Sequence, residues 1–147
     1  MKTNEEGLHI IKHFEGFRSH SYLCPAGVWT QGYGSTRNLK GKRFTGNEDP
    51  ITEDQAEHLL MRDCQRAEQA IDRLVRVPLS ENEFSALVSF IYNCGRGAFQ
   101  RSTMRMKINR EEMGDAALEF PKWCRAGGRK LRGLILRREM ERQLFVS

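Results

Sequence analysis

The amino-acid sequence predicts an α+β protein with three parts: a small glycine-rich β lobe (about 15–50), a long connecting helix (about 52–75) and a mainly helical lobe (about 76–147). Six glycines fall between positions 16 and 46, a density that suits turns and short strands. From Ala56 to Val75, apolar residues instead recur at helical spacing. At 147 residues, we expect one domain that contains both lobes.

Capping-box motifs mark the expected starts of three helices, because each joins a Ser or Thr to a Glu or Gln three residues later. The motifs are Thr3-x-x-Glu6, Thr52-x-x-Gln55 and Ser80-x-x-Glu83. The first predicts a helix near 4–13 that carries Glu15 to its C-terminal end. The second begins the connecting helix, which ends before Pro78, and the third begins a helix that Gly95 stops.

The remaining elements are shorter. Val28-Trp29-Thr30 and Tyr33 are the strand-like residues of the glycine-rich lobe. We expect helices around 102–108 and 111–120. Gly127-Gly128 then breaks the chain before a basic C-terminal helix.

Composition excludes several classes of protein. Hydrophobic residues make up 39% and charged residues 29%, which argues against disorder. No apolar run approaches the ~18–20 residues of a transmembrane helix, and the acidic start predicts no export signal. The four cysteines form no C-x-x-C pair, and the four histidines are not spaced as metal ligands. We therefore expect no metal and no cofactor. We also expect the thiols to be reduced.

The positive charge is concentrated in the C-terminal part of the chain. Residues 96–147 hold 13 Lys and Arg against 6 Asp and Glu, whereas residues 1–95 hold 11 against 13. A basic half suggests an anionic partner: nucleic acid, a membrane surface or an anionic cell-wall polymer. A merely solvated surface would have the same composition, so charge alone does not choose among these.

The residues that can carry chemistry lie early in the chain. Glu15 at the end of an apolar helix, then eight residues, Cys24, five residues and Thr30 resemble the active-site signature of phage-type lysozymes, or endolysins. That family has Glu, then Asp or sometimes Cys, then Thr at this spacing. The resemblance continues in order through residues 90–95, 102–104 and 123–145, and so spans nearly the whole chain.

The resemblance implies a lysozyme-like fold and hydrolysis of the β-1,4 bond between N-acetylmuramic acid and N-acetylglucosamine in peptidoglycan. Glu15 would protonate the leaving oxygen and Thr30 would place the attacking water. Cys24 occupies the place of the usual Asp, where a thiolate could assist the water or attack the sugar carbon. Ser35 stands where many relatives have His. By position, the substrate-contacting residues would be Thr36, Tyr92, Asn93 and Ser102.

Two alternatives stay open at this point. A lytic transglycosylase uses a single Glu with no partnering carboxylate, and would release 1,6-anhydro sugars. A non-catalytic cationic wall-binding module would explain the basic half.

For the hydrolase, we expect peptidoglycan as partner, no nucleic acid, no stable membrane insertion and a monomer. The protein would stay in the host bacterial cytoplasm until a separate holin-like permeabilising factor releases it to the periplasm and cell wall.

Overall fold

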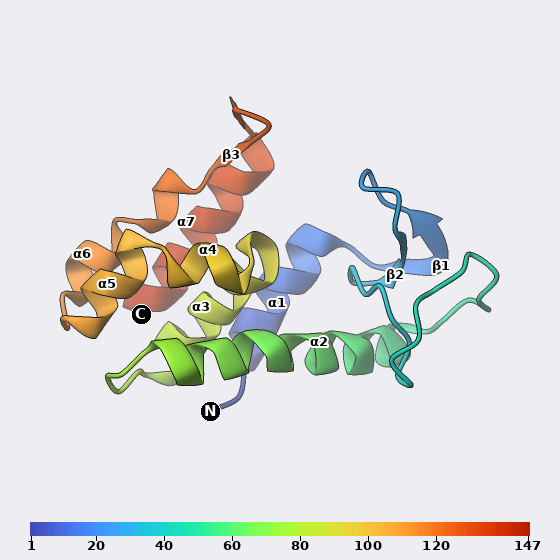
Figure 1. Ribbon diagram of the computed structural model, residues 1–147, viewed down its shortest axis with the longest axis horizontal. Coiled ribbons are helices and arrows are strands. Elements are labelled where there is room, and N and C mark those ends of the chain that lie inside the picture. Colours follow the sequence, from blue (N-terminus) through green and yellow to red (C-terminus); the bar gives the residue numbers. More distant parts are fainter. The chain divides into compact units, whose positions relative to one another are not determined.

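A computed structural model describes all 147 residues, which divide into two compact units. The helical unit comprises Met1–Phe14 and Arg66–Ser147, and the β unit comprises Glu15–Gln65. Helix α2 (Glu53–Leu74) contributes residues to both units (Figure 1). The predicted connecting helix is therefore confirmed.

The β unit is built on one antiparallel hairpin, β1 (Arg18–Leu23) with β2 (Trp29–Gly32). The register slips between Arg18 and Tyr22, so β1 carries extra residues and bulges. The side chain of Gln31, which is 1% exposed, forms hydrogen bonds that stabilise this bulge. Its amide donates to the carbonyl of Ser19 at 2.8 Å and to that of Asp49 at 2.9 Å. One buried side chain thus ties the hairpin to the loop that leads into α2.

The helix starts confirm two of the three predicted caps. The Thr52 hydroxyl accepts from the backbone N–H of Gln55 at 3.1 Å, and the Ser80 hydroxyl accepts from that of Glu83 at 3.0 Å. Ser80 begins α3 (Glu81–Cys94), and Gly95 follows that helix with φ +92°.

The prediction that Thr3 caps the first helix is wrong. Helix α1 (Glu5–Glu15) is capped by Asn4, whose side-chain oxygen accepts from the Gly7 N–H at 3.0 Å. The Thr3 hydroxyl donates instead to Glu68 at 2.7 Å, because α2 brings that carboxylate within reach.

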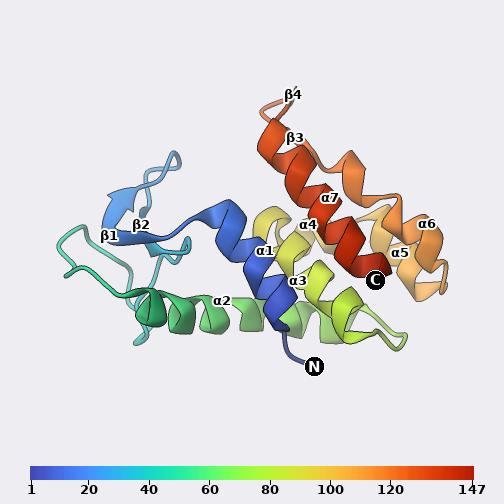
Figure 2. The same ribbon diagram turned by 180° about the vertical axis from the view of Figure 1, so that it is seen from behind.

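The helical unit surrounds α3, the most buried helix, and α7 (Arg132–Val146) packs along it (Figure 2). Phe90 of α3 lies at the centre, with edge-on contacts to Phe99, Phe120 and Trp123 at centroid distances of 5.3–6.4 Å. The shorter elements are α4 (Arg96–Gln100), α5 (Thr103–Asn109), α6 (Met113–Ala117) and the 3-10 helix η1 (Phe120–Lys122).

The predicted break before the last helix is a tight hairpin, β3 (Arg125–Ala126) with β4 (Arg129–Lys130). Gly127 and Gly128 form its turn with φ +59° and +77°, which side chains with a Cβ rarely adopt. The sequence pattern did not predict α4. No helix of the protein has the length and apolar character needed to cross a membrane.

Candidate active site

Glu15 is positioned by the end of a helix. It is the last residue of α1 and the first of the β unit, and its side chain is half-buried. Gly16 follows in the left-handed region with φ +74°, which ends the helix and turns the chain toward β1. The prediction that Glu15 lies at the C-terminal end of the first helix is confirmed.

Cys24 follows β1 directly and lies in the turn of the hairpin. Its backbone N–H donates to the carbonyl of Val28 at 3.0 Å, and its carbonyl accepts from Gly27 at 2.8 Å. The register pairs Tyr22 with Thr30, so the turn places Cys24 next to the strand that carries Thr30. The structure thus brings two of the predicted catalytic residues together through local hairpin geometry.

Hydrogen bonds lower the pKa of the Cys24 thiol below its ordinary value. The backbone of Val28 contributes most, followed by the backbone of Ala26, while burial acts in the opposite direction and the Thr30 side chain lowers the pKa further. Donors that face a thiol favour its charged form. The turn therefore promotes a thiolate, the form that acts as base or nucleophile.

The Thr30 hydroxyl is nearly buried, with 4% of the residue exposed. It lies 3.0 Å from the carbonyl of Val28 and can donate its single proton there or to the Cys24 sulfur, where the hydrogen bond lowers the pKa of the thiol. One hydroxyl proton serves one acceptor at a time, so in this arrangement the oxygen is left as an acceptor. It can receive a hydrogen bond from a water molecule beside Cys24.

Ser35 has a structural role in the β unit. Its hydroxyl donates to the Asp63 carboxylate of α2 at 2.6 Å, and its backbone pairs with that of Gln31 at 2.9 and 3.0 Å. Arg62 binds the same carboxylate at 2.9 Å and donates to the carbonyls of Arg37 and Asn38. Sequence reasoning missed this bracing role of Arg62 and Asp63, since their partners lie about 25 residues away.

The predicted substrate-contacting residues are divided between the units. Thr36 is an exposed residue of the β unit, whereas Tyr92, Asn93 and Ser102 belong to the helical unit. The exposed Asn93 accepts from Arg138 at 2.8 Å. The Ser102 hydroxyl caps α5 by accepting from the backbone N–H of Arg105 at 3.0 Å. It also donates to the backbone carbonyl of Phe99 at 2.7 Å. Contacts of these four residues with substrate stay predictions.

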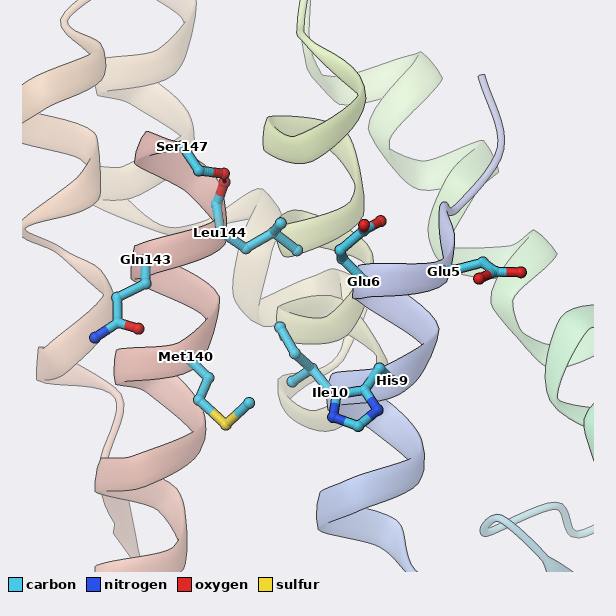
Figure 3. Close-up of a pocket in the computed structure, with 8 residues that line it drawn as sticks. All are labelled: Glu5, Glu6, His9, Ile10, Met140, Gln143, Leu144 and Ser147. Carbon is cyan, nitrogen blue, oxygen red and sulfur yellow. Dashed lines mark hydrogen bonds between the residues drawn. The ribbon is translucent and has the colours of Figure 1, made fainter.

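A pocket of about 510 Å³ lies between α1 and α7 within the helical unit. Figure 3 shows Ile10 and Leu144 pointing into this space from the two helices, with Glu5, Glu6 and His9 along α1. None of the predicted site residues lines it. No cluster of three or more His, Cys, Asp or Glu side chains is arranged to hold a metal ion.

Comparison with known proteins places these features among bacteriophage enzymes. The family model described as Phage lysozyme matches residues 12–141. The endolysin of Acyrthosiphon pisum secondary endosymbiont phage 1 is 40% identical over 151 residues, covering 100% of this chain and 99% of that protein. The endolysin of Bacillus phage B103 is 37% identical over 152 residues and covers 100% of this chain. The chain spans 55% of the length of that relative.

Among solved structures, a crystal structure of a mutant of P22 lysozyme superimposes with a TM-score of 0.91 at 36% identity. The match covers 100% of this chain and 99% of that one.

Proposed function

The chain belongs to the phage lysozyme family, and we propose that Glu15, Cys24 and Thr30 carry out its reaction on peptidoglycan. Its fold is lysozyme-like, as the sequence predicts, and its activity is that of an endolysin that hydrolyses the β-1,4 bond between N-acetylmuramic acid and N-acetylglucosamine. The observation that carries the proposal is the hairpin turn that places a thiol of lowered pKa beside the Thr30 strand.

Glu15 acts as general acid. Glycoside hydrolysis requires a proton for the leaving oxygen and stabilisation of an oxocarbenium-like transition state. A carboxylic acid at a helix end, directly before a turn, can supply that proton from a defined position. Glu15 fits this role because Gly16 turns the chain immediately after it.

Thr30 and Cys24 act on the water. A water molecule that donates one hydrogen bond to the Thr30 oxygen can direct its other proton to the Cys24 thiolate. The thiolate then accepts that proton as the oxygen attacks the sugar carbon. This route inverts the configuration at that carbon, whereas direct attack by sulfur would form a glycosyl-enzyme and retain it.

The Glu15→Gln variant tests the general acid. The amide keeps the size of the side chain but carries no acidic proton, so hydrolysis of purified peptidoglycan should fall by ~10²–10⁴-fold. Glu5→Gln on the exposed start of the same helix is the matched control and should hydrolyse at the parent rate. Circular dichroism and thermal melting verify that both variants fold. Substantial hydrolysis by a folded Glu15→Gln variant would remove Glu15 from the mechanism.

Analysis of the products tests the reaction class. Mass spectrometry of digested peptidoglycan should find reducing ends, and NMR during the first turnovers should find the inverted anomer. Fragments that end in 1,6-anhydro sugars would instead identify a lytic transglycosylase.

The monomeric state and the need for a holin-like factor are separate proposals. Sedimentation of the purified protein tests the first. For the second, the protein is expressed in a bacterial host with and without a membrane-permeabilising agent. Lysis that needs no agent would contradict the requirement for a separate factor.

A further inference from the structure

A second cavity of the helical unit is lined by arginines. It has a volume of about 470 Å³ and lies where the C-terminal end of α2 meets α4 and α5. Arg76, Arg101, Arg105 and Arg110 line it, together with neutral residues. No Asp or Glu contributes to the lining. Its volume lies in the range typical of ligand pockets.

The floor of this cavity is held in place by backbone carbonyls. Arg105 donates from Nε to Leu74 at 2.9 Å and from Nη1 to Gln100 at 3.2 Å. Asn109 donates to the same Leu74 carbonyl at 2.9 Å and accepts from the N–H of Arg76 at 2.8 Å. A guanidinium has five N–H donors, so Arg105 keeps three for a ligand while its plane is fixed. The site is organised before anything binds.

The positive charges of the cavity are not neutralised by the protein. None of its four arginines forms an ion pair. Arg101 ends α4 and Arg105 lies in the first turn of α5, so two helix ends bring these like charges to one cavity. A neighbouring cavity of about 450 Å³ shares Gln100 with the first and adds Arg73 and Arg96. A concentration of cations without anions favours a bound anion of several charges.

We propose that the arginine cavity, formed by Arg76, Arg101, Arg105 and Arg110, binds a multivalent phosphate group. Guanidinium groups match phosphate oxygens through paired N–H donors. A phosphate monoester carries about −1.5 to −2 charges at pH 7, whereas a carboxylate carries one, so phosphate balances four cations better. The proposal concerns binding only and does not depend on the hydrolytic reaction.

Titration calorimetry with inorganic pyrophosphate at about 0.15 M salt tests the site. The triple variant Arg76→Gln/Arg101→Gln/Arg110→Gln changes three exposed side chains and leaves the fixed Arg105 in place. Its affinity for pyrophosphate should fall at least tenfold, because three of the four guanidinium groups that donate charge-assisted hydrogen bonds to the phosphate are removed. The Glu15→Gln variant should bind pyrophosphate like the parent, which separates this site from the reaction.

The matched control removes the same charge elsewhere. Arg129→Gln/Lys130→Gln/Arg132→Gln changes three exposed cations at β4 and the start of α7, and should alter the affinity less than twofold. Equal losses in both triple variants would show that only the overall charge matters and would overturn the site. Absence of pyrophosphate binding by the parent protein at millimolar concentration would overturn it as well.

Vesicles then distinguish two sources of the phosphate. Cosedimentation with vesicles that contain phosphatidic acid, lost in the arginine-cavity variant but kept in the control, would support a lipid headgroup. Pyrophosphate binding without such cosedimentation would support a free phosphate compound.

Discussion

Arg138 and Glu141, three residues apart on α7, form an ion pair of 2.8 Å in which neither side chain is exposed to solvent. Arg137 joins the same carboxylate at 3.3 Å, and the Ser89 hydroxyl of α3 donates to it. Burial raises the pKa of Glu141, and the guanidiniums of Arg138 and Arg137 oppose that effect. Arg138 also donates to the Asn93 side chain, so the pair fixes a predicted substrate contact at the end of α3.

Replacing Glu141 by Gln should destabilise the protein strongly. The change leaves two buried guanidiniums without an anion, and breaking a buried pair by removing one partner costs about 3–5 kcal/mol. Thermal unfolding followed by circular dichroism should show a melting temperature lower by roughly 10 °C. Glu139→Gln on the same helix breaks only the partly exposed pair with Arg142 and should cost about 0–1 kcal/mol. A similar melting temperature for both variants would contradict the role of the buried pair.

Alkylation should select Cys24 among the four thiols. Its pKa is lowered by the Val28 and Ala26 backbone, whereas burial raises the pKa of Cys94. Cys64 and Cys124 are buried. Iodoacetamide near pH 7.5, followed by peptide mass spectrometry, should therefore label Cys24 first.

The sign of the pKa shift can be read from the same reaction. A lowered pKa means that the thiolate forms at a lower pH, so the labelling rate of Cys24 should reach half its maximum below the pH that an ordinary thiol requires. Faster labelling of Cys94 at every pH would contradict the turn geometry.

Substitution of Cys24 should separate chemistry from packing. Cys24→Asp restores the residue common at this position of the family and should keep much of the activity, whereas Cys24→Ala should lose most of it because no group then accepts the water proton. The Asp variant should be active at lower pH than the parent, since its carboxyl group ionises near pH ~4. Peptidoglycan hydrolysis across pH 4–9 checks both. If Cys24→Ala hydrolyses peptidoglycan at the parent rate, Cys24 has only a packing role.

Rising ionic strength should weaken lysis. The excess of Lys and Arg over residues 96–147 should attract anionic wall polymers, and such attraction is screened beyond ~8–10 Å at physiological salt. The initial rate of clearing of whole cell walls should fall between about 0.02 and 0.3 M salt. A rate that stays constant over this range would mean that the basic half does not contribute to wall association.

Features that depend on near neighbours in the chain follow from the amino-acid sequence without the fold. The caps at Thr52 and Ser80 join residues three positions apart, so each pair of partners is already close in the chain where the helix begins. The spacing of Glu15, Cys24 and Thr30 is local for the same reason, because one helix end and one hairpin place all three.

Hydrogen bonds and ion pairs between distant parts of the chain depend instead on how the helices and the hairpin pack. Asn4 caps α1 in place of Thr3, whose backbone N–H and hydroxyl both donate to Glu68, 65 residues away. The burial of Arg138 and the convergence of four arginines on one cavity likewise depend on how helices pack. A local pattern cannot reveal such contacts, since the energy of a charged side chain depends on which partner or solvent the fold places beside it.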